Sequence, residues 1–458
     1  ALAVTPVDTG NEENSILRPI DESSYIYDRN FGKNDPNYQF PPEYQAFIVG
    51  TLPFDQIDRA YKGYRYAINL NSIKQSQSMF ARRVFELLAS NTITISNYSR
   101  GVRLLFGDLV VTTDSGQEIV RRLQKLCGDP VNERKFRLAG LRKVMRDHTY
   151  QDRLAYVVGK VRGTQGNSRK GLLPTVTMIG YAKNQQQLDA LMASFERQTH
   201  TERRLLVVTP NDFVPSSAPH DSRVEVRTAG EVEGHTLGDL APASRWVAGI
   251  VPDDYHGPNY LLDLVLATRY SQATVIGKAT HHVWSAQDGM SLACPNAQYR
   301  PATSLQARCA LLNVEHSAST PLRDWVTSLY KSRLEMPAML AVDEFNYCKN
   351  GVRAPDAPNV VNDLVGLDEG LDMADLMARA EAVEAEQASA DTDPVITALE
   401  QGGALRLYLP NGETRDVLPQ AGSLLLFLSA DMPHEVLPAT RDRLSLTGWF
   451  RRRGNGPL

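Results

Sequence analysis

Residues 246–261 read WVAGIVPDDYHGPNYL, and the order of residue types in this stretch decides the fold. The apolar run 246–251 predicts a buried strand, and residues 257–261 predict the start of a helix. Asp253 and Asp254 stand between these elements, where the end of the strand fixes the backbone. Two carboxylates at such a position suit a hard divalent cation. The alternative is an ordinary β-turn, because Asp is common in turns near Pro and Gly.

The sequence on either side of this stretch alternates strands and helices. Strand patterns occupy 175–180, 204–208 and 224–226, and a helical pattern occupies 188–198. His281 and His282 fall on a later predicted strand, so their side chains are expected to point to opposite faces. The whole pattern predicts an α/β fold for this part of the chain.

Two stretches carry a resemblance to a known family: VPDDYHGPNYLLDLVLATRYSQATVIGKATHHVW from Val251 and SFERQTHTERRLLVV from Ser194. They resemble the family-2 glycosyltransferases of the single-Rossmann-like (GT-A) fold. The resemblance implies a domain over residues 171–351 that binds a nucleotide-sugar donor. It also implies that Asp253 and Asp254 hold Mn²⁺ or Mg²⁺, because a sugar diphosphate leaves as an anion that a cation must neutralise.

The same resemblance suggests further site residues. Asp212 is the candidate for contact with the nucleobase or ribose, and Lys278 is a candidate donor contact. The family's usual Glu-Asp pair, which includes the general base of an inverting enzyme, is absent downstream of the metal site. Asp324 and Asp343, the latter beside Glu344, are the catalytic substitutes. His256 is either a metal or phosphate contact or a loop residue.

The first part of the chain carries a second resemblance, on SMFARRVFELLASNTITISN from Ser78 and GVRLLFGDLVV from Gly101. The pattern predicts a helix over 78–89 that Ser78 caps, followed by a parallel strand. It resembles the donor-binding half of two-Rossmann-domain (GT-B) glycosyltransferases of the spore-maturation type. This implies a half-domain over residues 1–162, without the N-terminal Rossmann domain that such enzymes need.

In that GT-B half, the resemblance implies that Glu86 bonds the nucleotide ribose. The backbone amides of Ser78 and Met79 would face the diphosphate, because helix N-termini favour anions. The alternative is a solvated helix face formed by Arg82, Arg83 and Glu86.

The last part of the chain carries a third resemblance, on GGALRLY from Gly402 and MPHEVLPATRDRLSLTGWFRRR from Met432. It is similar to the C-terminal half of prolyl-hydroxylase-type Fe(II)/2-oxoglutarate oxygenases. The implied fold is a small, incomplete all-β domain over 395–458, a partial double-stranded β-helix. His434 would bind Fe²⁺ and Arg443 would pair with 2-oxoglutarate.

The iron site of that resemblance is incomplete. Such sites need two histidines and one carboxylate, yet no histidine lies between His316 and His434. Asp391 and Asp393 occupy the place of the usual His-x-Asp motif. Residues 163–170 are expected to be a linker, and residues 352–394 a linker that includes one exposed helix; a further strand is predicted at 422–429.

Composition sets the remaining limits. A chain of 458 residues has room for about three domains at ~150 residues each. The formal charge of −4 argues against nucleic acid as the main partner. No apolar run approaches the ~20 residues that span a bilayer, and the first ten residues do not resemble a signal peptide. Four dispersed cysteines fit a reducing compartment, so a cytoplasmic location is expected.

Four interpretations remain open at this point. The chain is a glycosyltransferase that acts on a glycan or protein acceptor, an oxygenase, or a non-catalytic assembly protein, and an oligomer is possible in each case. In addition, the sequence could omit stretches of a longer polypeptide, because all three segments lack parts that their relatives have.

Overall fold

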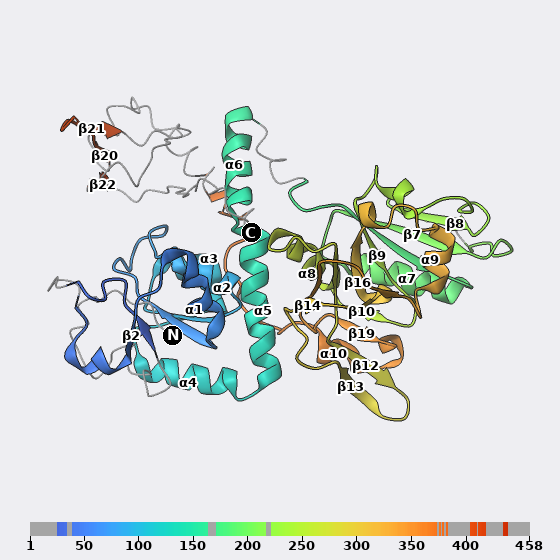
Figure 1. Cartoon of the computed structure of the whole chain (residues 1–458), viewed down its shortest axis with the longest axis horizontal. Helices are drawn as coiled ribbons and strands as arrows, with labels where there is room; N and C mark the ends of the chain where they lie inside the picture. Colours follow the sequence, from blue (N-terminus) through green and yellow to red (C-terminus); the bar gives the residue numbers. More distant parts are fainter. Residues whose placement is uncertain are drawn as a thin grey trace. The chain divides into compact units, whose positions relative to one another are not determined.

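The computed structural model describes residues 25–33, 39–163, 171–216, 221–372, 375–376, 378–379, 382, 404–409, 411–417 and 434–437. The chain divides into two compact units (Figure 1). Unit 1 comprises Ala1–Arg169 and Gly366–Leu458, and unit 2 comprises Lys170–Val365. Unit 1 is therefore discontinuous in sequence, because the whole of unit 2 is inserted into it.

The centre of unit 1 is a three-stranded parallel sheet in the order β3-β4-β5. Its strands are β3 (Tyr66–Asn69), β4 (Ile93–Ser96) and β5 (Val110–Thr112). The short strands β1 (Ile26–Tyr27) and β2 (Ile48–Gly50) form a separate parallel pair. The helices of unit 1 are α1 (Ile57–Gly63), α2 (Arg83–Ala89), α3 (Arg100–Phe106), α4 (Gly116–Cys127), α5 (Pro130–Asp147) and α6 (Tyr150–Arg162). The expected β-α-β order is present.

Helix α2 begins later than the sequence predicts. The predicted start at Ser78 was wrong, because the preceding residues are bonded to polar side chains instead of to a helical turn. Ser76 Oγ accepts hydrogen bonds from the amides of Ser78 (3.3 Å) and Met79 (2.9 Å). The Ala81 amide donates to Asn71 Oδ1 at 2.8 Å. Such local side-chain bonds compete with helix formation.

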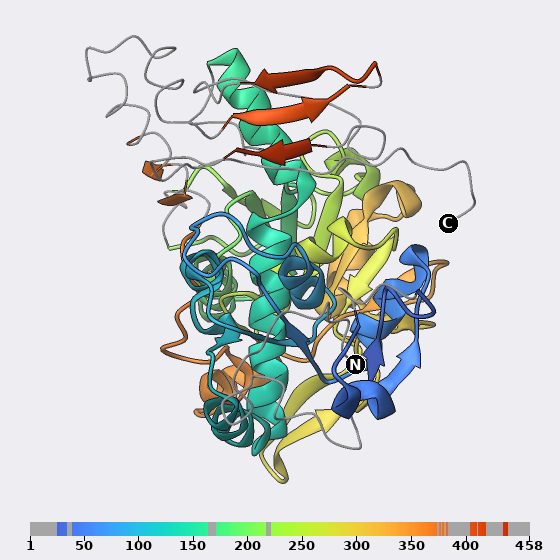
Figure 2. The same ribbon diagram turned by 90° about the vertical axis from the view of Figure 1, so that its left-hand side faces the viewer.

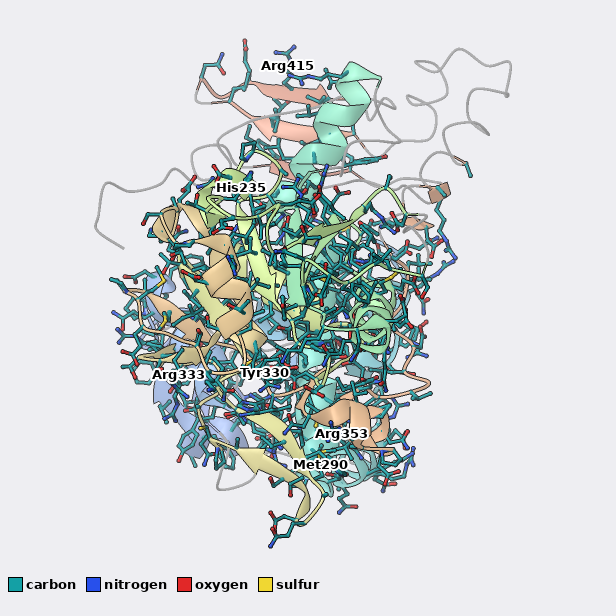
Figure 3. All side chains as sticks on the ribbon, turned by 90° about the vertical axis from the view of Figure 1, so that its right-hand side faces the viewer. His235, Met290, Tyr330, Arg333, Arg353 and Arg415 are labelled. Atoms are coloured by element: carbon teal, nitrogen blue, oxygen red, sulfur yellow. The ribbon has the colours of Figure 1, made fainter. Side chains whose placement is uncertain are left out.

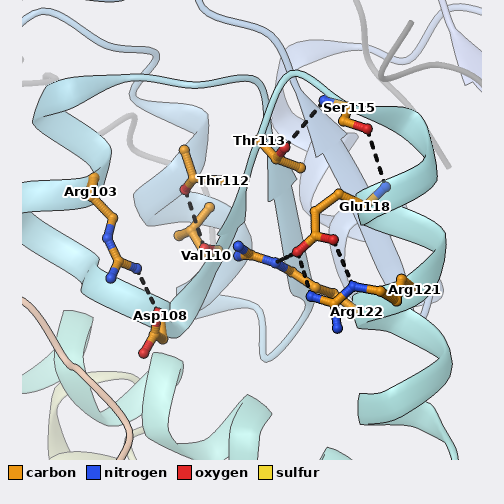
Figure 4. Close-up of polar contacts among 9 residues, drawn as sticks. All are labelled: Arg103, Asp108, Val110, Thr112, Thr113, Ser115, Glu118, Arg121 and Arg122. Atoms are coloured by element: carbon orange, nitrogen blue, oxygen red, sulfur yellow. Dashed lines mark hydrogen bonds and ion pairs between the residues drawn. The ribbon is translucent and has the colours of Figure 1, made fainter. Parts of the chain in front are cut away.

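Polar side chains set the start of the next helices. Ser115 Oγ accepts the amide of Glu118 at 3.3 Å and caps α4, as Figure 4 shows. The Glu118 carboxylate in turn accepts bonds from Arg121 and Arg122, and these hydrogen bonds lower its pKa to about 2. An acidic side chain in the first turn also complements the helix dipole.

The segment that follows unit 2 packs back onto the first part of unit 1. The Asp108 amide donates to Asp368 O at 2.6 Å, and the Leu371 amide donates to Leu104 O at 2.8 Å. The buried Lys143 ammonium of α5 donates to Leu371 O at 2.7 Å. Residues 352–394 were expected to form one linker, but the structure assigns 352–365 to unit 2 and 366–372 to unit 1.

Unit 2 is built on an eight-stranded mixed sheet in the order β14-β18-β11-β16-β9-β6-β7-β8. Four of its strands are parallel to one another: β6 (Val176–Tyr181), β7 (Arg203–Thr209), β8 (Val224–Thr228) and β9 (Trp246–Gly249). The others are β11 (Val275–Gly277), β14 (Pro301–Ala302), β16 (Ala310–Asn313) and β18 (Met339–Ala341). The predicted strands and helix of this segment are present with ends shifted by a few residues.

Helices cover both faces of this sheet. One core cluster joins α7 (Gln185–Arg197) and α8 (Tyr260–Leu266) to one face, and a second joins α9 (Leu322–Ser328) to the other face. Unit 2 therefore has three layers, a typical arrangement for a mostly parallel sheet.

A smaller sheet in the order β10-β19-β12-β13 completes unit 2. It consists of β10 (Tyr255–His256), β19 (Tyr347–Lys349), β12 (His281–Ser285) and β13 (Gly289–Ala293), with α10 (Ala357–Val361) packed against it. The two histidines open strand β12, whereas Lys278 directly follows β11 of the larger sheet.

The last described strands form a small antiparallel sheet, which Figure 2 shows as three adjacent arrows. They are β20 (Leu405–Tyr408), β21 (Thr414–Val417) and β22 (His434–Val436). The predicted strand at 422–429, most of the predicted helix within 352–394 and residues 164–170 of the predicted linker lie outside the described residues. No helix of the described part of the chain is long and apolar enough to cross a membrane.

We expect Gly107→Ala to weaken unit 1. Gly107 has φ 51° and ψ −122°, and a Cβ there would lie 2.3 Å from Asp368 O. Backbone strain and this clash should lower the free energy of unfolding by at least about 2 kcal/mol, measured by denaturant unfolding. Gly163→Ala is the control, since Gly163 has φ +67° but no atom within 4 Å of the place that an added methyl group would take; it should cost only about 1 kcal/mol. Equal losses would contradict the proposed packing.

Candidate functional site

The carboxyl ends of β6 and β9 lie at the point where the strand order of unit 2 reverses. From β6 the chain proceeds to β7 and β8 on one side, and β9 pairs with the other side of β6. In open α/β sheets, ligands bind at this reversal, outside the carboxyl ends of the strands. Asp253 and Asp254 follow β9 there, as the sequence predicted for their strand-end position.

Asp254 is fully buried and its carboxylate is saturated with hydrogen bonds. Arg308 Nε donates to Oδ2 at 2.8 Å and Arg308 Nη2 donates to Oδ1 at 2.5 Å. Tyr347 Oη donates to Oδ2 at 2.6 Å, and the Asn350 amide donates to Oδ1 at 2.8 Å. A carboxylate has about four lone-pair positions, and all four are occupied here. Asp254 therefore has no free lone pair for the expected metal-ligand role. The structure favours an anchoring role for this residue instead.

The charge state of the buried Asp254 carboxylate follows from its hydrogen-bond partners. Burial raises the pKa of Asp254, while the hydrogen bonds from Arg308, Tyr347 and Asn350 act in the opposite direction. Because every one of these partners donates, the ionised carboxylate is the form that fits the geometry. Breaking one half of such a buried pair leaves an uncompensated charge.

A glycine allows Arg308 to reach Asp254. Arg308 lies in the 3-10 turn Ala307–Cys309, which crosses close to the end of β9. A Cβ at Gly249 would lie 2.4 Å from Ala307 O. Only a residue without a side chain permits this approach, so Gly249 helps to bring Arg308 against the aspartate loop.

Asp253 is the partly exposed carboxylate of the pair. Its side chain is 34% exposed and its Oδ1 lies 3.7 Å from Arg353 Nη2. Tyr330 Oη donates to Asp253 Oδ2 at 2.6 Å. Figure 3 labels Tyr330 and Arg353, which come from separate segments of unit 2. Of the two aspartates, Asp253 is the one that can meet a ligand.

The loop after β19 carries the remaining contacts of the aspartate pair. Asn350 is in the left-handed region at φ 57°, which turns the chain so that its amide meets Asp254. The Val352 amide donates to Asp253 O at 3.1 Å. Asn tolerates this conformation better than most residues. This loop therefore holds the side chain of Asp254 and the backbone of Asp253.

Lys278 and Asp343 form a buried ion pair with each other. Lys278 Nζ lies 2.7 Å from Asp343 Oδ1, which also accepts the Phe345 amide at 2.9 Å. The lysine and aspartate side chains are 0% and 3% exposed. The structure therefore favours a structural role for both residues over the predicted donor contact and the predicted catalytic base.

Asp324 remains the exposed candidate for a base. It lies in the first turn of α9, the helix that leads into Tyr330. Asp212, the predicted nucleoside contact, is exposed after the carboxyl end of β7. Its neighbour Asn211 accepts the Gly230 amide at 2.7 Å, which holds the loop of Asp212 to the loop after β8.

Two histidines of unit 2, His256 and His281, lie in a cluster with Tyr260 and Tyr347. His256 is fully buried, and its ring centroid is 4.7 Å from that of Tyr260 and 5.5 Å from that of Tyr347. Burial lowers the pKa of His256 to about 3 and that of His281 to about 4. Both rings are therefore neutral at physiological pH, and the packing favours a core role for His256.

In unit 1, the predicted donor contacts lie close to a buried polar network. Glu86 accepts from Arg82 Nε at 2.8 Å, so the pair forms a partly exposed i,i+4 contact. The amides of Ser78 and Met79 already donate to Ser76 Oγ, which a diphosphate would have to displace. The sequence did not reveal the buried network at the ends of β3 and β4, formed by Asn69, Asn71, Ser96 and Asn97.

The C-terminal site residues are described only in part. His434 opens β22 and pairs with Leu407 of β20. Arg443, Asp391 and Asp393 lie outside the described residues. With one histidine in this region of the sequence, the residues do not fit a two-histidine, one-carboxylate iron site. Across the part of the chain that the structure describes, no group of three or more His, Cys, Asp or Glu side chains could hold a metal ion.

Four residues of the aspartate network were missed by the sequence interpretation: Arg308, Tyr330, Tyr347 and Asn350. They are 54 to 96 positions from their aspartate partners. No spacing rule connects positions so far apart. Arg308, a charged residue between Ala307 and Cys309 directly before β16, is the single local signal that could have identified one of them.

Comparison with known proteins finds two family matches within the sequence. The glycosyl transferase-like family matches residues 14–159, and the 2OG-Fe(II) oxygenase superfamily matches residues 391–451. No curated protein matches the chain.

Solved structures similar to the chain include residues 1–349 of S. aureus TarS, alone, with UDP-GlcNAc and with UDP. Their sequence identities are 12%, 13% and 11%, and their TM-scores are 0.25, 0.26 and 0.25. Each match covers 48% of this chain and 67%, 68% and 67% of the TarS chain, respectively. By the two family matches alone, parts of the chain are similar to glycosyl transferase-like proteins and to the 2OG-Fe(II) oxygenase superfamily.

The two aspartates should differ in their effect on stability. Asp254→Asn leaves Arg308 buried without a counter-charge, so the free energy of unfolding should fall by about 3–5 kcal/mol. Asp253→Asn removes a partly exposed carboxylate and should change it by less than about 1 kcal/mol. Denaturant unfolding of both variants measures the difference. Similar values for the two variants would contradict the separate anchoring role of Asp254.

Proposed function

We propose that unit 2 is a GT-A-type glycosyltransferase domain that transfers a sugar from a nucleotide-sugar donor to a glycan or protein acceptor. The observation that carries the proposal is the position of Asp253. It is a partly exposed carboxylate at the strand-order reversal of an α/β sheet, and a saturated Asp254 network holds its loop. This is where an α/β sheet binds its ligand, and an oxygen donor of this kind suits a metal–diphosphate group.

In this proposal, Asp253, Arg353 and Asp212 would each have a separate role in sugar transfer. Asp253 would hold Mn²⁺ or Mg²⁺ together with donor oxygens and water, and the cation would supply charge neutralisation for the leaving diphosphate. Arg353 has a side chain that is 72% exposed beside Asp253, so its guanidinium can approach an anionic donor. Asp212 and its loop would contact the nucleoside at the neighbouring strand end.

Asp324 is the proposed general base. It would accept the proton of the acceptor hydroxyl while that oxygen forms a bond to the anomeric carbon and the bond to the nucleoside diphosphate breaks. Asp324 is exposed and lies on the helix that leads into Tyr330, the hydrogen-bond donor to Asp253. Asp343 is less suited to this task because Lys278 occupies its Oδ1.

For unit 1, we propose a GT-B-type donor-binding half over residues 1–162. The family match over 14–159 supports this assignment. Glu86 would contact the ribose, and the backbone around Ser78 and Met79 would face the diphosphate. Asn69 and Ser96, which end parallel strands at the same edge of the sheet, hydrogen-bond to each other there and support that edge.

A thermal-shift screen of nucleotide sugars with and without Mn²⁺ tests the proposed donor site. A donor that binds the folded state raises the melting temperature by mass action, and Mn²⁺ should increase that shift. Asp253→Ala should abolish the Mn²⁺-dependent part and reduce donor turnover on the order of 10²-fold or more. Asp288→Ala on the β12–β13 turn is the control. Unchanged turnover in Asp253→Ala would refute the proposal.

The base is tested by Asp324→Asn. Loss of proton abstraction should reduce kcat by about 10²–10⁴-fold while donor KM stays close to that of the wild type. Asp343→Asn distinguishes the second carboxylate, because its buried partner Lys278 makes a loss of stability the main expected effect. If Asp324→Asn keeps full kcat, another group is the base.

The C-terminal match supports a second candidate function, an Fe(II)/2-oxoglutarate-dependent hydroxylase. Its test is succinate formation from 2-oxoglutarate that requires iron and is lost in both His434→Ala and Arg443→Ala. Iron-independent succinate formation, or none, would reject this activity. The incomplete ligand set described above gives no basis for a reaction step at iron.

A further inference from the structure

We infer that Tyr330 is a positioning residue for Asp253: its hydroxyl holds Oδ2, so that Oδ1 is the oxygen presented to the metal–diphosphate group. The inference rests on the proposed function of unit 2 and adds to it the residue that orients the ligand-binding carboxylate. Tyr330 Oη donates to Asp253 Oδ2 at 2.6 Å. An O–H···O⁻ bond of this length belongs to the strong, charge-assisted class.

The two oxygens of Asp253 differ in how firmly they are held. Oδ2 receives the short bond from Tyr330, whereas Oδ1 faces Arg353 at 3.7 Å. The Arg353 side chain is 72% exposed, and exposed ion pairs of this kind contribute little to stability. A cation and the diphosphate can therefore replace Arg353 at Oδ1 without disturbing the bond at Oδ2.

Tyr330 is itself held from two directions. It follows α9, and Trp325 and Val326 of this helix, with Leu329 directly after it, are buried in the core of unit 2. Its ring centroid lies 5.0 Å from the Arg308 guanidinium carbon, a cation–π distance. Arg308 is fixed in turn by the two hydrogen bonds that it donates to Asp254. Contacts through Arg308 and Tyr330 thus connect the buried Asp254 to the partly exposed Asp253.

The donor role of Tyr330 is available at neutral pH. A tyrosine hydroxyl ordinarily has a pKa of about 10. The hydroxyl therefore keeps its proton and donates a hydrogen bond to the carboxylate. With Oδ2 occupied in this way, a rotation of the Asp253 carboxylate would cost a charge-assisted hydrogen bond.

Tyr330→Phe tests this role because it removes the hydroxyl and keeps the ring that contacts Arg308. The measurement is Mn²⁺ binding by electron paramagnetic resonance in the presence of a nucleoside diphosphate, with UDP as the first probe. The apparent dissociation constant for Mn²⁺ should rise about tenfold, whereas UDP binding without metal should stay unchanged. Tyr270→Phe, elsewhere in unit 2, is the matched control and should bind as the wild type does. Melting temperatures confirm that each variant is folded.

The possible results separate the two proposals. If the wild-type protein binds no nucleoside diphosphate in a Mn²⁺-dependent way, the proposed function fails and the role of Tyr330 fails with it. If the wild-type protein binds and Tyr330→Phe binds equally well, only the role of Tyr330 is overturned. Should Tyr330→Phe unfold more easily than Tyr270→Phe yet bind Mn²⁺ normally, the hydroxyl is structural, which also overturns the inference.

Discussion

The bonding of the Asp254 carboxylate determines how the candidate site of unit 2 is built. A buried charge is costly unless every one of its hydrogen-bonding positions is filled. Here the four donors come from two separate segments: the turn of Arg308, and strand β19 with the loop that follows it, which supply Tyr347 and Asn350. To satisfy one carboxylate, these segments must converge on the end of β9. That convergence leaves Asp253, the adjacent residue, directed toward the partly exposed side.

Adjacent residues of the same type thus have opposite physical roles. Asp254 belongs to the interior and is defined by the number of donors around it, whereas Asp253 is defined by one short bond and one weak contact. The division is efficient in structural terms, because a rigid neighbour limits the motion of the ligand-facing side chain. The aromatic cluster of His256, Tyr260 and Tyr347 behind the pair adds a packed support without adding charge.

The sequence predicts the features of this site that are local and fails for those that are not. Strand β9 and the turn that follows were found because their apolar run and their Asp-Asp pair are contiguous. The difference between Asp253 and Asp254 could not be predicted, since it depends on Arg308 and Asn350, 54 and 96 positions from Asp254. The start of α2 was missed for a related reason: Asn71 and Ser76 compete for the amides of the predicted first turn. Family resemblance supplied candidate roles for Glu86 and Asp212, but their chemistry is a matter for experiment.

The interruption of unit 1 by unit 2 has a consequence for synthesis on the ribosome. Asp108 leaves the ribosome early, but its partner Asp368 is 260 positions later in the chain. Gly107 and Gly370 make room for this late segment, because methyl groups there would collide with Asp368 and Leu105. The α/β part of unit 1 must therefore wait, with its α3–α5 surface incomplete, until all of unit 2 has been translated. Since domains tend to fold as units during translation, unit 2 can reach its native fold before the unit that encloses it in the sequence.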